Sequence, residues 1–251
     1  MPGQYFSQHG FDIRLEWGLA AAQHLAKDAD CVIVVDVMSF STCVSVANDN
    51  GALIAPWPWK DASAQAYAAE MGAQAASIDR RFSAETFTLS PASLLNIPAG
   101  TKLVLPSPNG STIAFKAREH GGAVYSAGLR NRQATAAACG HFQRILVIPC
   151  GERWPDGSLR PAIEDYVAAG GIIQALGMRL RSPDAEMAVA AFQAAQQQNF
   201  AVLKECASAT ELRERGFATD VELCLQVDVS ANACQLAGKF FVPCVNDNSK
   251  P

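Results

Sequence analysis

Two adjacent carboxylates, Glu164 and Asp165, stand in the first turn of a helix that the sequence otherwise predicts to be buried. The helix begins after Pro161, and the run 166–177 is almost wholly apolar, which is typical of a helix packed in a core. Buried carboxylates are costly unless they are paired, hydrogen-bonded or bound to a metal, although a helix N-terminus offsets part of that cost. Two interpretations are equally supported: a metal or catalytic site, or two acids that only complement the helix dipole.

A third carboxylate, Asp36, ends the strand-like run of β-branched residues at 31–37. One interpretation is an aspartate that caps the following helix. In the other, Asp36 joins Glu164 and Asp165 as hard oxygen ligands for Mg²⁺, which recruits one or two carboxylates and leaves a substrate phosphate to complete its shell. That set predicts phosphoryl-transfer or phosphatase chemistry. The haloacid dehalogenase type of phosphatase is excluded, because it needs a second aspartate where Met38 stands.

Two turns that lead into helices have the composition of phosphate-binding loops. One follows a predicted strand at 102–106 and the other follows the strand at 31–37, and their N–H groups and hydroxyls would face an anion. Each turn alone is more simply a helix cap, but the two on one sheet edge with acids nearby favour anion binding. The candidate phosphate ligands in these turns are Ser41, Thr42, Asn109, Gly110 and Ser111.

The loops after two further predicted strands, at 123–126 and 144–149, add polar and cationic candidates. If the strands are parallel, all four loops lie at one edge of the sheet, which is where open α/β sheets bind ligands. Arg130 or Arg153 would balance negative charge in the transition state. The candidates in these loops are Arg130, Asn131, Gly151 and Arg153.

Asp36, Glu164 and Asp165 are thus predicted both as catalytic residues and as the metal ligands. Asp36 and Cys150 are also the side chains able to act as nucleophiles. Direct attack by water held at the metal and a covalent intermediate both remain open, and we favour direct attack.

Strand-like and helix-like patterns alternate along the chain, which predicts an α/β fold with a mainly parallel sheet covered by helices on both faces. No linker or internal repeat interrupts residues 1–251, so we expect a single domain. Residues 79–100 are predicted to form a long loop. The predicted strands are 12–17, 31–37, 52–57, 73–78, 102–106, 123–126, 144–148 and 239–242. The predicted helices are 19–27, 41–50, 61–71, 111–119, 131–139 and several segments from 162 to 227.

The composition is that of a compact enzyme, with 49% hydrophobic and 18% charged residues in a chain of 251. A net charge of −4 without a basic run argues against nucleic acid as a partner. The sequence also shows no signal peptide and no apolar run of membrane-spanning length. The eight cysteines contain no C-x-x-C pair and mostly fall in predicted strands and helices, which indicates reduced thiols and a cytoplasmic location.

Several of these segments resemble, in matching order over roughly residues 30–243, the motifs of the 2-phosphosulfolactate phosphatase family. Each motif alone is modest, and the ordered set is fairly specific. The matching segments are 36–44, 107–111, 129–131, 151 with 163–165 and 169–170, 216–221, 227–228, and a shortened one that contains Phe87 and Pro91.

The resemblance implies a three-layer α/β/α sandwich with a mainly parallel or mixed central sheet, and a Mg²⁺-dependent phosphatase. The implied reaction converts 2-phospho-3-sulfolactate, a small anionic phosphorylated substrate, into 3-sulfolactate and phosphate. In methanogens this step belongs to coenzyme M biosynthesis.

The chain departs from the family motif at Ser39, where the family has an arginine. A guanidinium at this place would suit a phosphate or sulfonate, so its replacement bears on the substrate. Arg130, Arg153, Arg160 or the pair Arg80 and Arg81 could supply the charge from neighbouring loops.

Two functions from different classes follow. The first is a phosphoric monoester hydrolase acting on a small phosphorylated hydroxy acid. The alternative is a non-catalytic protein that binds a small anion on the same scaffold, because a fold does not fix a function. Assembly into a homo-oligomer is compatible with both.

Overall fold

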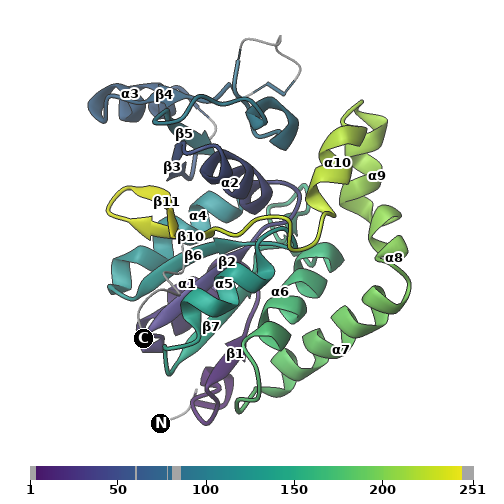
Figure 1. Ribbon diagram of the computed structural model, residues 1–251. Helices are drawn as coiled ribbons and strands as arrows, with labels where there is room; N and C mark the ends of the chain where they lie inside the picture. Colours follow the sequence, from purple (N-terminus) through teal and green to yellow (C-terminus); the bar gives the residue numbers. More distant parts are fainter. Residues whose placement is uncertain (1–3, 60, 78, 81–85, 245–251) are drawn as a thin grey trace.

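The protein folds around one large sheet of nine strands with helices on both faces, in a computed structural model that describes residues 4–59, 61–77, 79–80 and 86–244 (Figure 1). The α/β class and the three-layer sandwich expected from the sequence are confirmed. Residues 78 and 81–85, which include the predicted end of one strand and Arg81, lie outside the described residues.

The strands of the large sheet are β1 (Ile13–Leu15), β2 (Cys31–Val35), β3 (Leu53–Trp57), β4 (Gln74–Ala75), β5 (Lys102–Pro106), β6 (Ala123–Ala127), β7 (Ile145–Pro149), β10 (Ala233–Ala237) and β11 (Phe240–Cys244). The hairpin β8 (Glu152–Arg153) and β9 (Leu159–Arg160) forms a separate small sheet.

The α-helices of the described residues are α1 (Gly18–Leu25), α2 (Phe40–Asp49), α3 (Ser63–Glu70), α4 (Gly110–Ala117), α5 (Arg132–Cys139), α6 (Ile163–Ala175), α7 (Pro183–Gln197), α8 (Ala201–Lys204), α9 (Ala207–Glu214) and α10 (Ala218–Cys224). Short 3₁₀ turns lie at Gln4–Ser7, Ala26–Asp28, Pro91–Leu94 and Arg118–His120.

The sheet consists of two parallel sets joined by an antiparallel hairpin. Its strand order is β1-β7-β2-β6-β10-β11-β3-β5-β4. Strands β1, β7, β2 and β6 pair in parallel, and so do β3, β5 and β4, whereas β10 and β11 pair antiparallel with each other and with their outer neighbours. The C-terminal hairpin, yellow in Figure 1, therefore fills the centre of the sheet.

The pairings β6–β10, β10–β11 and β11–β3 are all antiparallel. The strands β3, β5 and β4 therefore run in the direction opposite to that of β1, β7, β2 and β6. The expectation that all the loops lie at one edge of a parallel sheet is thus wrong in its simple form. The loop after β5 still reaches the end of β2, where the N–H of Gly110 lies 2.9 Å from Asp36.

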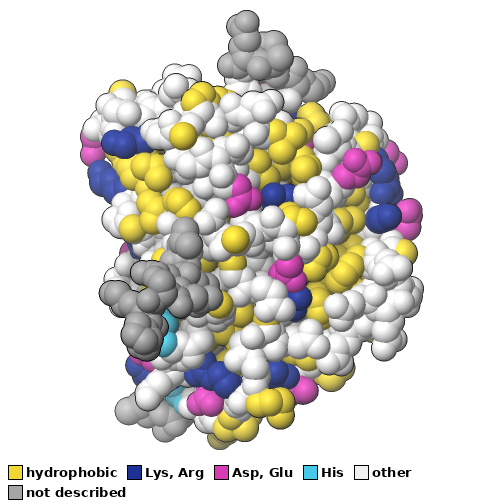
Figure 2. All heavy atoms as spheres, viewed as in Figure 1, with side chains coloured by type: hydrophobic (Ala, Val, Ile, Leu, Met, Phe, Trp, Pro, Cys, Tyr) yellow, Lys and Arg dark blue, Asp and Glu magenta, His cyan; other side chains and the backbone are white. Residues whose placement is uncertain are grey.

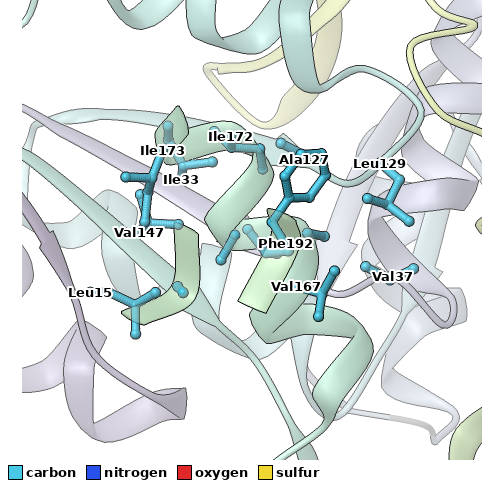
Figure 3. Close-up of a cluster of buried hydrophobic side chains, with 14 of the residues drawn as sticks. Leu15, Ile33, Val37, Ala127, Leu129, Val147, Val167, Ile172, Ile173 and Phe192 are labelled. Carbon is cyan, nitrogen blue, oxygen red and sulfur yellow. The ribbon is translucent and has the colours of Figure 1, made fainter. Parts of the chain in front are cut away.

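Alternate residues of the strands face two hydrophobic cores, as the two-residue period of a strand requires. Val32 and Val34 of β2 face the core under α1, α2 and α4, while Ile33 and Val35 face the core under α5, α6 and α7. Figure 3 shows the second core, in which strand residues pack against two helices: Leu15, Ile33, Val147, Val167, Ile172, Ile173 and Phe192.

Helix α6 packs so closely on α7 that its glycines have no room for a side chain. A Cβ on Gly170 would overlap the backbone carbonyl of Ala188, and one on Gly171 would lie 2.6 Å from Phe192. This packing buries the apolar helix predicted at 162–177 and, with it, the two acids at its start.

Two hairpins and one short strand differ from the sequence-based expectation. Strand β10 was not predicted, and only β11, as 239–242, was anticipated. The predicted strand 73–78 corresponds to the shorter β4, and the hairpin β8–β9 lies in the segment expected to be a loop after β7. Each of these strands is short or partly exposed, so it lacks the buried apolar run that marks β2 and β7.

On the face seen in Figure 2, basic and acidic side chains are interspersed, with no continuous basic area. Among the described residues, none of the helices combines the length and the apolar character needed to cross a bilayer.

Candidate active site

The carboxylate of Asp36 lies at the end of β2 and is held by donors from two helices. The N–H of Phe40, in the first turn of α2, donates to Oδ1 at 3.2 Å, and the N–H of Gly110, the first residue of α4, donates to Oδ2 at 2.9 Å. Asp36 is only 6% exposed, and burial raises its pKa, against the opposing effect of these two N–H groups and of Arg80. The side chain is thus fixed at a point where charge is costly.

The turn before α4 is built around this carboxylate. The hydroxyl of Ser107 lies 3.5 Å from Asp36 Oδ2 and also accepts the N–H of Asn109 at 3.3 Å. A Cβ on Gly110 would lie 2.7 Å from Asp36 Oδ2, so glycine is required for the backbone to approach. The N–H groups of Asn109 and Gly110, which the sequence suggested for a phosphate, are directed at protein oxygens here.

Asp165 joins the first turn of α6 to the ends of two strands. Its Oδ1 accepts the N–H of Val37 at 2.7 Å and its Oδ2 accepts the N–H of Gly151 at 2.9 Å. Burial, followed by the nearby charges of Glu164 and Asp36, raises its pKa well above the ordinary value. Both oxygens serve to position the loops after β2 and β7 around the site.

Glu164 is also buried, at 2% exposure. Its negative charge contributes to raising the pKa of Asp36, of Asp165 and of the Cys206 thiol. The three acids predicted from sequence are therefore close enough for their charges to interact. Their contacts differ: Asp165 accepts backbone N–H groups, whereas Glu164 interacts with Cys206 at the start of α9.

A fourth acid, Glu152, completes the group. Its Oε2 accepts the side-chain amide of Asn109 at 2.9 Å, which ties the start of β8 to the N-terminus of α4. Burial and then the charge of Asp36 raise the pKa of Glu152 to about 6. Glu152 follows a predicted strand, but it was not among the candidates from sequence. Its position directly after Gly151, in the same loop as the predicted Arg153, is the feature that could have indicated it.

A guanidinium from a distant segment faces these acids. Arg80 donates from Nη2 to the hydroxyl of Ser39 at 3.2 Å, and its charge favours the ionised form of Asp36, which lowers the pKa of that carboxyl. Arg80 Nη1 is buried and has no hydrogen-bond partner among the described residues. Arg80 thus lies beside Ser39, the position at which the sequence departs from the motif that it resembles.

Asp36, Arg80 and Glu152 line one small cavity, with a volume of about 170 Å³, whereas Glu164 and Asp165 are not part of its lining. Its walls come from the ends of β2 and β5, the segment at 80, the start of β8, and helix α9. The lining residues that carry charge are Asp36, Arg80, Glu152, Glu211 and Arg215. Those that carry other polar groups are Ser39, Ser107, Asn109 and Ser208.

Three predicted phosphate ligands have internal partners instead. Ser41 accepts the N–H of Asp36 at 3.0 Å and donates to the carbonyl of Val34, Thr42 donates to the carbonyl of Val37, and Ser111 donates to the carbonyl of Leu105. All three are at most 1% exposed. Hydroxyls near a helix N-terminus often bond the local backbone in this way, and here they fasten α2 and α4 to the strands before them.

Arg130 and Asn131 lie apart from the cavity. Arg130 pairs with Asp49, at the far end of α2, at 3.3 Å, and also contacts Gln226. The side-chain amide of Asn131 accepts the N–H of Gly128 at 3.0 Å and donates to the carbonyl of Ser126. The loop after β6 is thereby closed on itself and on the C-terminal segment.

Gly151 and Arg153 border the site without lining the cavity. Gly151 has a φ of 66° and supplies the N–H that Asp165 accepts. Arg153 is exposed and donates to the carbonyl of Pro108 at 3.0 Å and to Asn109 Oδ1 at 3.4 Å. It braces the turn before α4 from outside.

Cys150 is the other nucleophile considered from sequence. Its thiol packs in the core under α1, α2 and α4, and burial, followed by the charges of Asp36 and Asp165, raises its pKa well above the ordinary value. A thiol acts as a nucleophile in its ionised form, so this environment disfavours that role.

No group of three or more histidine, cysteine, aspartate or glutamate side chains in the described part of the chain is arranged as a metal cage. Mg²⁺ seldom uses such a cage: it binds one or two carboxylates and keeps water and substrate oxygens as its other ligands. Asp36 and Asp165 are buried, and the charge of Glu164 raises the pKa of both, so this group of oxygen donors fits a hard divalent ion.

A search of curated proteins gives no match to this sequence. A family model described as 2-phosphosulpholactate phosphatase matches residues 19–238, which is most of the chain and contains every residue of the cavity. The chain therefore belongs to the 2-phosphosulpholactate phosphatase family.

Proposed function

We propose that this protein hydrolyses the phosphate ester of a small hydroxy acid, and that its substrate is 2-phosphosulfolactate, which yields 3-sulfolactate and phosphate. The proposal is supported by membership of a phosphatase family. The observation that carries it is the cavity of about 170 Å³, which is lined by both the Asp36 carboxylate and the Arg80 guanidinium.

Arg80 is the residue best placed to bind the phosphate. Its Nη1 has no partner among the described residues, although the atom is buried. A buried, unpaired donor is costly, and an anionic oxygen in the cavity would satisfy it with a charge-assisted hydrogen bond. The hydroxyls of Ser39 and Ser107 line the same cavity and can add neutral donors.

Mg²⁺ is part of the proposal, with Asp36 and Glu164 as the residues that would hold it. Asp165 would support them through its bonds to Val37 and Gly151. The ion would supply positive charge that polarises the phosphoryl oxygens and offsets their negative charge. Asp36, fixed by two backbone N–H groups, would also accept a proton from an attacking water molecule.

The first test is phosphate release from a panel of phosphate esters of hydroxy acids, including 2-phosphosulfolactate, with Mg²⁺ and with EDTA. We expect turnover that depends on Mg²⁺. If the purified protein binds inorganic phosphate but releases none from any ester, the protein is an anion-binding member of the family and the proposed function is wrong.

Asp36→Asn tests the site directly, because it removes the charge and keeps the shape. We expect turnover to fall at least a hundredfold, on the scale of a lost proton-transfer group, with a far-ultraviolet circular dichroism spectrum like that of the parent. Asp49→Asn is the matched control, since that carboxylate also accepts several hydrogen bonds but lies with Arg130 outside the cavity. Near-normal turnover of Asp36→Asn would reduce Asp36 to a structural cap.

A further inference from the structure

Glu152 has features of a reacting group that the proposed function leaves unused. It is the first residue of the hairpin β8–β9, and it forms a wall shared by the Asp36 cavity and a neighbouring cavity of about 200 Å³ lined by Trp17 and Leu159. Glu152 is thus part of the lining of the cavity that holds Asp36 and Arg80.

The carboxyl of Glu152 also differs from its neighbours in how many donors it accepts. Both oxygens of Asp36 and both oxygens of Asp165 accept backbone N–H groups, which partly oppose the rise in pKa that burial causes. Among the described residues, Glu152 accepts only the side-chain amide of Asn109, at Oε2. Its Oε1 is therefore available to carry a proton.

The charges around Glu152 favour that proton. Asp36 at the end of β2 and Glu164 on α6 raise its pKa after burial, while Asn109 at the start of α4 and Arg160 on β9 lower it. Arg80, Glu211 and Arg215 are the other charged residues of the same cavity, and Arg153 follows on the same strand. The resulting pKa of about 6 is near the value at which a carboxylic acid is both protonated and able to give the proton up.

We propose that Glu152 is the general acid of the reaction and protonates the leaving oxygen of the ester. This inference rests on the proposed phosphatase function and adds a catalytic residue to it. The ester P–O bond breaks, and its electron pair stays on the alcohol oxygen, which takes the proton from Glu152 Oε1. Water forms the new P–O bond and gives a proton to Asp36, and exchange with solvent then removes that proton from Asp36 and returns one to Glu152. The balance is one ester and one water consumed, and one alcohol and one hydrogen phosphate formed.

The closing experiment compares the parent protein with Glu152→Gln on a series of phosphate esters whose alcohols range from acidic phenols to alkyl alcohols. A phenolate leaves without a proton, whereas an alkoxide does not. We expect Glu152→Gln to lose about a hundredfold or more in kcat on alkyl esters and little on esters of acidic phenols. The dependence of rate on leaving-group acidity should therefore be steep in the variant and shallow in the parent.

The pH profile supplies a second readout on an alkyl ester. Activity of the parent should fall as the pH rises and Glu152 loses its proton, and this limb should be missing in Glu152→Gln. Asn109→Ala, which removes the hydrogen-bond partner but not the acid, should keep the shallow dependence. An equal loss on all esters, or no loss on any, would overturn the role of Glu152. Failure of the parent to hydrolyse any ester would instead overturn the proposed function.

Discussion

Ser39 and Arg80 show how a single position can be compensated from elsewhere in the chain. Ser39 is buried at the end of the loop after β2, and the guanidinium of Arg80 reaches its hydroxyl from 41 residues away in the sequence. The charge that an arginine at position 39 would provide is thus supplied by a different element. The replacement at Ser39 then has little effect on the charge of the cavity.

This compensation predicts a reciprocal pair of variants. Arg80→Ala should weaken substrate binding by the worth of a charge-assisted hydrogen bond, about 1.5–3 kcal/mol, which raises KM roughly tenfold to a hundredfold. Ser39→Arg in the Arg80→Ala background should restore much of the loss, because the new guanidinium enters the space that Arg80 vacates. Steady-state kinetics on 2-phosphosulfolactate measure both effects.

Arg144→Ala is the control for that pair, since Arg144 is exposed and pairs with Asp30 before the start of β2. Its KM should equal that of the parent. Ser39→Arg alone, with Arg80 still present, should not improve KM. An Arg80→Ala variant with unchanged KM would assign the phosphate to Arg215 or to a residue outside the cavity.

Candidate site residues could be predicted from sequence where they lie directly beside a recognisable strand or buried helix. Asp36, Glu164 and Asp165 stand next to buried apolar runs, and the structure places all three within one electrostatic cluster. The hydroxyls of Ser41, Thr42 and Ser111 have the right types and positions, but sequence does not show whether a hydroxyl points to a ligand or to its own backbone. Arg80 was one of several candidates, because only the tertiary fold decides which arginine is near.

The hairpin β8–β9 is the element that holds Glu152 and closes the cavity. It leaves β7 through Gly151, whose φ of 66° lies in the left-handed region that favours glycine. A Cβ at this position would also lie 2.9 Å from the carbonyl oxygen of Arg160 and 2.7 Å from Leu159. The close return of β9 over Gly151 thus depends on the missing side chain.

Gly151→Ala should therefore displace the hairpin and lower both stability and activity. The positive φ alone costs about 1–2 kcal/mol, and the overlap with β9 adds about 1–3 kcal/mol. Gly157→Ala is the matched control: its φ is 84°, but nothing lies within 4 Å of the added Cβ. Chemical denaturation and kcat would separate the two, since Gly157→Ala should lose stability only. Equal kcat in both variants would mean that the hairpin is not part of the site.

Strands and helices with long buried apolar runs could be predicted from sequence, whereas strands whose position depends on pairing with distant strands could not. Strand β2 and helix α6 are apolar enough to be recognised alone, as is typical of parallel strands and core helices. The hairpin β10–β11 has partly exposed strands, and its place between β6 and β3 depends on pairings across more than 100 residues. No local pattern carries that information.

At the scale of the whole molecule, the sheet gathers acids that repel one another. The antiparallel hairpin joins two parallel sets, and the loops of both sets converge on Asp36. Burial and mutual repulsion raise the pKa of Asp36 and of Asp165 in the folded protein above the ordinary value of 3.8. The folded state thus binds protons more tightly than the unfolded state, so the stability linked to these groups is present at low pH and is lost as the pH rises through their folded pKa values.

The metal-free protein should consequently melt at a lower temperature as the pH is raised above about 4, and Mg²⁺ should reverse part of the loss. A ligand that binds only the folded state at 100 times its Kd adds about 2.7 kcal/mol, which corresponds to roughly 5–10 °C in Tm for a chain of this size. The Mg²⁺ shift should grow with pH, because protons and the metal compete for the same oxygens. Differential scanning calorimetry with EDTA and with Mg²⁺ at several pH values measures this without reference to activity. The Mg²⁺-dependent rise in Tm should be mostly lost in Asp36→Asn and kept in Asp49→Asn. A Tm that changes with neither pH nor Mg²⁺ would show that these acids neither carry buried charge nor hold a metal.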